Sequence, residues 1–294
     1  MSNPRIAFEL ADRRPLLAPP DGKPLIVHLV VNVEHWRFDQ PMPRKALTSP
    51  HGVEAVPDVP NFAWAEYGMR AGMPRLLKLF ANRGLPASCS FNASVIEAYP
   101  ACAEAIRDAG WEFVGHGLDQ KSIQGEADEA AVIETALSMI EAFTGTRPRG
   151  WLGPGLRESY ETPDILRAAG IEYVYDWPLD DLPCWMTTKH GPMLAMPYTL
   201  EINDSPIYAG DKHASGEIHR RMLNTLACFE HELAARPKVL TLGLHPHLIG
   251  VPHRFVYLVE MLDILQARSD TIFMTGAGIA EWFIAADAAA SNRS

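Results

Sequence analysis

The chain has 294 residues, of which 47% are hydrophobic and 21% are charged, a composition typical of a globular protein with a substantial core. Its net charge of −10 would repel a nucleic-acid backbone, and no stretch is apolar for long enough to cross a membrane or to form a signal peptide. The four cysteines are widely spaced and form no Cys-x-x-Cys pair, so we expect reduced thiols in a cytoplasmic protein without nucleic-acid or membrane partners.

The first elements lead to a polar strand end. Residues 1–24 are rich in proline and predict an extended arm that lies on the domain or on a neighbouring subunit. A long apolar, β-branched run then predicts a buried strand at 24–33, which ends in an acid, an imidazole and an indole at 34–36. Residues 37–65 hold five prolines with little periodicity, and a connection of this length is usually functional or a lid.

The rest of the chain alternates between helices and strands. Apolar periodicity and stop signals predict helices at 73–83, 94–109, 127–144, 163–169, 216–236, 255–268 and 278–287. Strands are predicted at 86–92, 111–116, 173–177, 194–198, 239–245 and 271–275. This alternation predicts a single α/β domain over residues 25–294, folded as a closed or nearly closed parallel barrel, with a doubly wound open sheet as the alternative.

Polar side chains gather at the ends of three predicted strands. They are Glu34 and His35 after the first strand, His116 with Asp119 and Gln120 after the third, and His245 with His247 after the strand at 239–245. A lone histidine is more often structural, but parallel barrels assemble their active sites at this edge from separate loops. The pattern therefore predicts one active site made of these residues.

The order of these segments resembles the polysaccharide deacetylase superfamily. That superfamily has an aspartate pair after the first strand, a His-x-x-x-His motif, an Arg-Pro loop and a late Leu-His strand end. The counterparts here are Asn32-Val33-Glu34-His35, His116-Gly117-Leu118-Asp119-Gln120, Arg147-Pro148-Arg149-Gly150-Trp151 and Leu244-His245-Pro246. The resemblance implies a distorted (β/α)7 parallel barrel with a hydrolytic site.

Two metal-ligand positions depart from that pattern. The resemblance puts the superfamily's catalytic-base aspartate on Glu34, its metal-binding aspartate on His35, and its two ligand histidines on His116 and Gln120. Two imidazoles and an amide lack the anionic ligand, so they bind a divalent cation weakly. We expect no strongly held cofactor, and the alternative is a weakly held Zn²⁺ on His35, His116 and Gln120.

A narrower resemblance is to the metal-independent allantoinases and the related cyclic imide hydrolases of this superfamily. It rests on the segments at 66–70, 147–155, 180–183, 197–204 and 245–254, which read EYGMR, RPRGWLGPG, DDLP, PYTLEIND and HPHLIGVPHR. All of them are expected in loops, where barrel enzymes bind substrate. The resemblance implies a hydrolase that acts on a carbon–nitrogen bond of a small ring.

Opening such a ring needs an activated water, a donor to the oxyanion and a proton for the departing nitrogen. We assign Glu34 as the general base, with a pKa raised by desolvation, and His245 as the proton donor. His116 orients the water, polarises the carbonyl or shares a zinc ion. The candidate substrate-binding residues are His35, Trp36, Tyr67, Arg70, Arg149, Trp151 and Asn203. Salt bridges, core packing or a turn are the structural alternatives for them.

The sequence leaves two other functions open. One is a metal-dependent N-deacetylase of a sugar or oligosaccharide, and the other is a catalytically inactive binding protein. The expected partner is a small cyclic imide or amide. The proline-rich arm and loops also predict a homo-oligomer, either a dimer or a tetramer.

Overall fold

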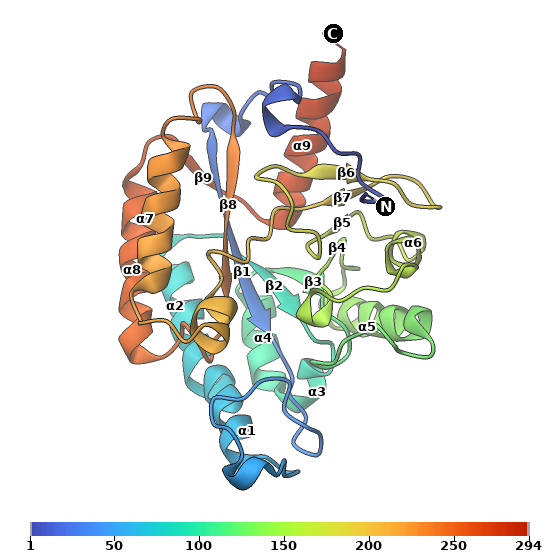
Figure 1. Ribbon diagram of the computed structural model, residues 1–294, viewed down its shortest axis with the longest axis vertical. Helices are drawn as coiled ribbons and strands as arrows, with labels where there is room; N and C mark the ends of the chain where they lie inside the picture. The colour runs from blue at the N-terminus through green and yellow to red at the C-terminus, as the bar shows by residue number, and fades with distance from the viewer. Residues whose placement is uncertain (1, 293–294) are drawn as a thin grey trace.

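One sheet of nine strands organises residues 2–292, the part of the chain that the computed structural model describes (Figure 1). The strands are β1 (Leu25–Val33), β2 (Ser88–Phe91), β3 (Glu112–Gly115), β4 (Gly150–Trp151), β5 (Tyr173–Val174), β6 (Cys184–Met186), β7 (Met193–Ala195), β8 (Lys238–Leu244) and β9 (Thr271–Phe273). Their order is β6-β7-β5-β4-β3-β2-β1-β8, with β9 also paired to β1. All pairs are parallel except β6 with β7.

The sheet curls towards a barrel, because its edge strand β8 returns to the loops around β6 and β7. The Val239 amide donates a hydrogen bond to the Asp181 carbonyl, and the Thr241 hydroxyl donates one to the Pro197 carbonyl. An isolated parallel bridge joins Asn203 to β8. The predicted distorted parallel barrel is therefore confirmed, and the open doubly wound sheet is not the fold.

Strand β1 lies at the centre of the sheet, and all nine of its residues are buried. It pairs with β2 along its second half, with β8 along most of its length and with β9 at its start. Because side chains alternate between the two faces of a strand, Leu29 and Val33 pack against the helices whereas Ile26 and Val30 face the barrel interior. Glu34 continues the second series, which brings its carboxyl group to the mouth of the interior.

Helices surround the sheet on its outer side and close one of its ends. They are α1 (Val59–Tyr67), α2 (Met73–Arg83), α3 (Val95–Ala98), α4 (Pro100–Asp108), α5 (Glu129–Thr144), α6 (Thr162–Ala168), α7 (Glu217–Phe229), α8 (Pro252–Ala267) and α9 (Gly276–Ser291). Helix α9 packs on the interior cluster at the amino end of the strands, and α1 lies beyond their carboxyl end (Figure 1). No helix within residues 2–292 is both long and apolar enough to span a membrane.

Several elements differ from the sequence prediction. Helix α1 occupies part of the segment expected to be irregular, where Asp58 caps its first turn and Pro60 lies at its start. A π-helix, η4 (Gly68–Gly72), joins α1 to α2 without a break, and a second one, η6 (Ser205–Gly210), occupies an expected loop. Strand β6 was not predicted, because it has only three residues and one of them, Trp185, is exposed.

The amino-terminal arm lies on its own domain, beside β6, β7 and α9 (Figure 1). Arg5 forms an ion pair with Asp164 at 2.9 Å, and Arg14 forms one with Asp180 at the same distance. Arg236 also donates to the Arg14 carbonyl at 2.7 Å. These contacts fix an arm that is extended apart from two short 3-10 turns, η1 (Ala11–Arg13) and η2 (Pro20–Gly22), as its proline content predicts.

Candidate active site

Three buried side chains form a hydrogen-bonded chain at the carboxyl end of β1 and β8. The His245 Nε2 atom lies 3.4 Å from Glu34 Oε1, and the His245 Nδ1 atom lies 2.6 Å from Asp204 Oδ1. The other Asp204 oxygen accepts from the backbone amides of His245 and Ile249, at 2.7 and 3.1 Å. Because β1 and β8 are parallel neighbours, their ends bring Glu34 and His245 together although they lie far apart in sequence.

The charges in this chain are set by mutual attraction. Burial lowers the pKa of His245, but the negative charges of Asp204 and Glu34 outweigh it and raise the pKa to about 9. Burial also raises the pKa of Glu34, yet the attraction of His245 and Arg44 outweighs this effect, so the pKa lies below its usual value. The raised pKa expected for Glu34 is therefore wrong, since that expectation considered burial without the neighbouring cations. At neutral pH the pair is a carboxylate and an imidazolium.

His116 presents an unpaired acceptor beside this pair. Its Nδ1 atom bonds the Leu152 carbonyl, which can only accept, so the proton lies on Nδ1 and the Nε2 lone pair is free. Burial lowers the pKa of His116, which keeps the ring neutral. Its Nε2 and the Gln120 Oε1 atom are buried without a hydrogen-bond partner within residues 2–292. A polar ligand or water at this position would satisfy both.

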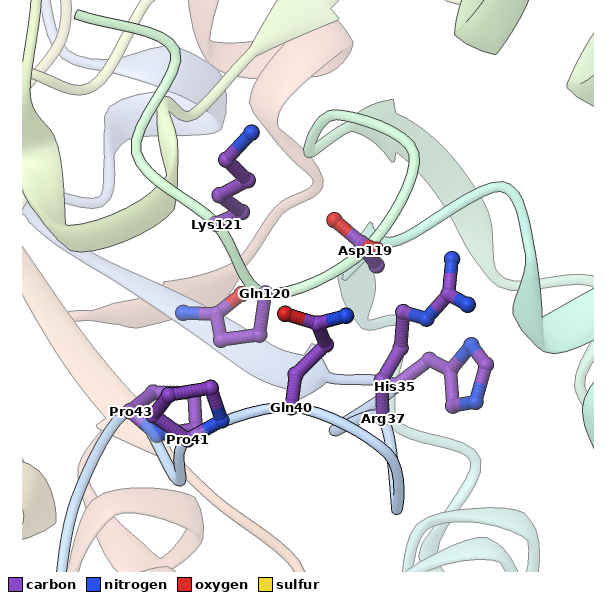
Figure 2. A pocket seen from close by; sticks show the side chains of 8 residues that line it. All are labelled: His35, Arg37, Gln40, Pro41, Pro43, Asp119, Gln120 and Lys121. Atoms are coloured by element: carbon purple, nitrogen blue, oxygen red, sulfur yellow. The ribbon is translucent and has the colours of Figure 1, made fainter. Parts of the chain in front are cut away.

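His35 does not converge with His116 and Gln120. Its Nδ1 atom lies 2.7 Å from the Ser94 hydroxyl, and its ring packs edge-on against Tyr99 at 5.8 Å. Figure 2 shows the His35 ring and the Gln120 side chain pointing apart. In the described part of the chain, no group of three His, Cys, Asp or Glu side chains is arranged to hold a metal ion. The expected weak site on these three residues therefore does not fit a divalent cation.

A cluster of aromatic rings with a further unpaired nitrogen lies next to His245. The His247 ring packs edge-on against Trp36 and Trp64, with centroids 5.3 and 4.8 Å apart. Burial lowers the pKa of His247 to about 3, so this imidazole is neutral, and its Nε2 is buried without a partner among the described residues. Trp36 itself donates to Glu34 Oε2 at 2.8 Å. These rings enclose His247 in a largely apolar environment beside the buried pair.

A cavity of about 360 Å³ opens beside Gln120. It lies between the loop after β1 and the loop after β3, and is lined by His35, Arg37, Gln40, Pro41, Pro43, Asp119, Gln120 and Lys121 (Figure 2). Gln120 lines this cavity, and its side chain raises the pKa of His116 against the effect of burial. The cavity therefore lies beside His116, the neighbour of the buried pair.

Two candidate substrate-binding residues lie elsewhere in the fold. Arg149 precedes β4 and forms ion pairs with Glu172 and Glu281, away from the carboxyl ends of the strands. The ring of Trp151 is fully buried in a hydrophobic cluster and packs over Gly115. Both assignments were wrong, because β4 has only two residues and its sequence does not show which side chains face the site.

Three further candidates do not touch the buried pair. Asn203 is buried against Gly243 of β8, where it helps to close the barrel. Arg70 is 73% exposed and forms an ion pair with Glu66 of the preceding turn. The Tyr67 hydroxyl accepts a hydrogen bond from an arginine of α2 at 3.0 Å. These side chains have structural partners, and the structure gives none of them a contact with Glu34 or His245.

Sequence reasoning did not assign several residues that the structure places in the site. Asp204 is the partner of His245, although its neighbour Asn203 was chosen from the same segment. Asn92 joins two strand ends, since its side chain accepts from the His35 amide at 2.9 Å and donates to the His116 carbonyl. The signal for Asn92 was its position as a polar residue directly after β2.

Asp176 acts on His116 through one peptide group. Both of its carboxyl oxygens accept from the Gly153 amide, at 2.8 and 3.0 Å, and the carbonyl of the same peptide, that of Leu152, accepts from His116. A side chain at Gly153 would place its Cβ 3.1 Å from Asp176 Oδ2. The glycine therefore allows this close approach, and the arrangement holds His116 in the tautomer that leaves Nε2 unprotonated.

The comparisons with known proteins agree with this fold. The polysaccharide deacetylase family model matches residues 65–174. A Helicobacter pylori peptidoglycan deacetylase is 27% identical over 156 residues, covering 52% of this chain and 53% of the relative. A Schizosaccharomyces pombe protein assigned to the polysaccharide deacetylases is 26% identical over 239 residues, covering 74% and 73%. The chain has the polysaccharide deacetylase fold, and these matches support a hydrolase of that superfamily.

Two solved structures resemble nearly the whole chain. Puue allantoinase superimposes with a TM-score of 0.85 at 26% identity, covering 97% of this chain and 98% of that protein. A polysaccharide deacetylase homologue from Pseudomonas aeruginosa superimposes with a TM-score of 0.80 at 27% identity, covering 92% and 94%. The chain is thus similar both to a protein named an allantoinase and to one named a polysaccharide deacetylase.

Proposed function

We propose that this protein is a hydrolase that opens small cyclic imides or amides, such as succinimide-, hydantoin- or allantoin-like rings. The proposal rests on the buried chain of Glu34, His245 and Asp204, which holds a carboxylate and an imidazolium 3.4 Å apart at neutral pH. Such a pair supplies a base and an acid in one site, and each group already has the protonation state that its role needs. The residues aligned with the superfamily's metal ligands do not form a suitable donor set, so no step is assigned to a metal.

In the proposed reaction, Glu34 removes a proton from a water molecule as its oxygen attacks a ring carbonyl. The new carbon–oxygen bond gives a tetrahedral intermediate with a negatively charged oxygen. His245 then donates its proton to the ring nitrogen as the carbon–nitrogen bond breaks, which yields a ring-opened acid and amide. Asp204 fixes the orientation of His245 and stabilises its charged form, as an aspartate does for histidine in hydrolytic triads.

The unpaired polar atoms favour a compact substrate with both donors and acceptors. A cyclic imide carries an N–H between two carbonyl oxygens. The site offers buried acceptors at His116 Nε2 and Gln120 Oε1 and a buried donor at Arg44 Nη1, all without partners in the described chain. The cavity of about 360 Å³ beside Gln120 also suits a small ring better than a polymer.

Two alternatives remain as outcomes of the test. A metal-dependent N-deacetylase is favoured by the relative named a peptidoglycan deacetylase, but it needs a ligand set that these side chains do not form. A catalytically inactive binding protein is the other, and proteins of this fold named as pseudoenzymes have been solved. Turnover of any ring substrate would exclude the inactive protein.

The experiment is a hydrolysis assay on succinimide, hydantoin, allantoin and N-acetylated chitooligosaccharides, each with and without a strong chelator. We expect turnover of at least one ring that the chelator does not change. Glu34→Gln keeps the shape of the side chain but removes the base, and we expect a loss of about 10³-fold or more in kcat. Glu201→Gln, an exposed change of the same kind, should leave kcat unaltered.

Turnover of the oligosaccharides alone, abolished by the chelator, would contradict the proposal and support the deacetylase. Full activity of Glu34→Gln on a ring substrate would remove Glu34 as the base. A circular dichroism spectrum and a thermal melt of each variant establish that the fold is intact.

A further inference from the structure

Arg44 carries a buried donor that no side chain or carbonyl of the described chain satisfies. Its Nη1 atom has no hydrogen-bond partner within residues 2–292, although the atom is enclosed by protein. A buried, unpaired guanidinium N–H costs free energy, so native proteins pair such groups with protein, water or ligand. Met42, two residues before Arg44, packs with Trp36, whose indole donates to Glu34. The charge of Arg44 also acts on both Glu34 and His247, so the guanidinium lies beside the candidate active site.

The loop that carries Arg44 is held on both sides of this residue. Before it, Met42 is buried against Trp36 in a small hydrophobic cluster. After it, the backbone amides of residues 46 and 47 donate to Asn61 Oδ1 at 2.8 and 3.0 Å, and the Asn61 amide donates back to the Leu47 carbonyl at 2.8 Å. Asn61 is itself buried in α1. The position of Arg44 is therefore set by folding rather than by contact with a ligand.

The charges around Glu34 indicate that this guanidinium could stabilise an oxyanion. The groups whose charges stabilise ionised Glu34 are His245, Arg44 and His247. His247 is neutral at physiological pH, and in the proposed reaction His245 gives its proton away. Of these three groups, only Arg44 then keeps a positive charge throughout the reaction. The tetrahedral intermediate needs a donor to its oxyanion, and the residues aligned with metal ligands do not supply a Lewis acid.

We propose that Arg44 is a catalytic residue whose Nη1–H binds the carbonyl oxygen under attack and stabilises the negative charge that develops on it. This inference rests on the proposed hydrolysis and adds to it the group that replaces a metal ion as electrophile. The fixed loop preorganises the donor, so the interaction strengthens as charge develops and costs no reorganisation. The substrates are then neutral carbonyl compounds, because the guanidinium is engaged by the reacting oxygen and not by a substrate carboxylate.

The experiment compares Arg44→Met, Arg44→Lys and Arg44→Ala with Lys45→Met as the control. Lys45 is the adjacent cation on the same loop, but it pairs with Glu54. On the ring that wild type opens fastest, we expect Arg44→Met to lower kcat by about 10²- to 10³-fold with little change in KM. Arg44→Lys should retain part of the activity, and added guanidinium chloride at millimolar concentration should partly restore kcat in Arg44→Ala. Lys45→Met should behave as wild type.

Three results would overturn the proposal: a kcat for Arg44→Met within threefold of wild type, a rise in KM at constant kcat, or no rescue of a folded Arg44→Ala variant by guanidinium. The outcome is separable from that of the proposed function. If only N-acetylated oligosaccharides are turned over, cyclic amide hydrolysis fails as the function, and the same Arg44 series is measured on that substrate. A dependence on guanidinium there would still support Arg44 as the oxyanion donor.

Discussion

Asp204 determines the pH up to which the imidazole of His245 remains charged. Its carboxylate lies 2.6 Å from the His245 Nδ1 atom, and this attraction is the main cause that raises the pKa of His245, against burial, to about 9. A general acid must hold its proton, so activity should fall as the pH rises through that value. The same attraction from His245 and Arg44 keeps Glu34 ionised, so the loss of the base occurs only at strongly acidic pH.

The pH dependence of kcat/KM tests this arrangement. We expect a basic limb near pH 9, and no acidic limb in the range where an ordinary glutamate titrates. Asp204→Asn removes the charge that raises the pKa of His245, so its basic limb should move by about one unit or more to lower pH, with a lower maximum. Asp263→Asn, an exposed control, should keep the wild-type profile. An unshifted basic limb in Asp204→Asn would mean that another group is the acid.

At the level of residues, the direction of a side chain is predictable after a long strand and unpredictable after a short one. Glu34 and His245 come directly after strands of nine and seven residues, so the alternation along each strand indicates where their side chains point. Trp151 belongs to a strand of two residues, which is too short to show an alternation. Arg44 lies in an irregular loop, where no periodicity exists, and only the position of that loop was predictable.

At the level of elements, the π-helix η4 supports the turn that carries two of the site's histidines. Residues Gly68 and Gly72 of η4 lie directly against the backbone of His247 and Pro246. A Cβ atom at residue 68 would lie 2.7 Å from His247 Cβ, closer than such atoms can approach. In this π-helix both Gly68 and Gly72 face the loop after β8. Such π-helical turns often occur at functional sites.

Gly68→Ala should therefore displace His247 and its neighbour His245. We expect a loss of about 1–3 kcal/mol in the free energy of unfolding from overpacking, together with a fall in kcat of at least tenfold. Gly210→Ala is the matched control in the other π-helix, where the nearest atom, Ser205 O, lies 3.9 Å from the added Cβ. Urea unfolding and steady-state kinetics measure the two effects. Wild-type kcat in Gly68→Ala would show that the contact does not position the histidines.

The order of helices and strands was largely predictable, because the apolar residues of each β/α repeat recur at the spacing of a strand or of a helix. Among the elements that escaped this reasoning are β6 and α1. Strand β6 pairs with β7 in the antiparallel sense at the edge of the sheet and needs no long apolar run. Helix α1 has several prolines and aromatic residues nearby, and its amphipathic pattern is weak because it packs on the active-site loop as well as on the domain.

At the scale of the whole molecule, the amino-terminal arm adds exposed apolar surface beside β6. The side chains of Phe8, Leu16 and Trp185 are 87%, 64% and 40% exposed. The homo-oligomer expected from the sequence stays a prediction, and this surface is where we expect the subunits to meet. Light scattering should give a dimer or tetramer for wild type and a smaller species for Phe8→Ser. Val256→Ser, a change at an exposed residue of α8, should not alter the mass. A wild-type monomer would contradict the prediction.

The pairing of β1 with strands from the far end of the chain has a consequence for biosynthesis. As the ribosome makes this protein, β1 emerges before its neighbours β8 and β9, which are built from residues 238–244 and 271–273. This long apolar strand must wait without two of its three partners until those residues have been made, and such a nascent chain is prone to aggregate. Glu34 and His245 accordingly cannot meet before the chain has been made as far as β8, so a translation product that stops before that strand lacks the buried pair.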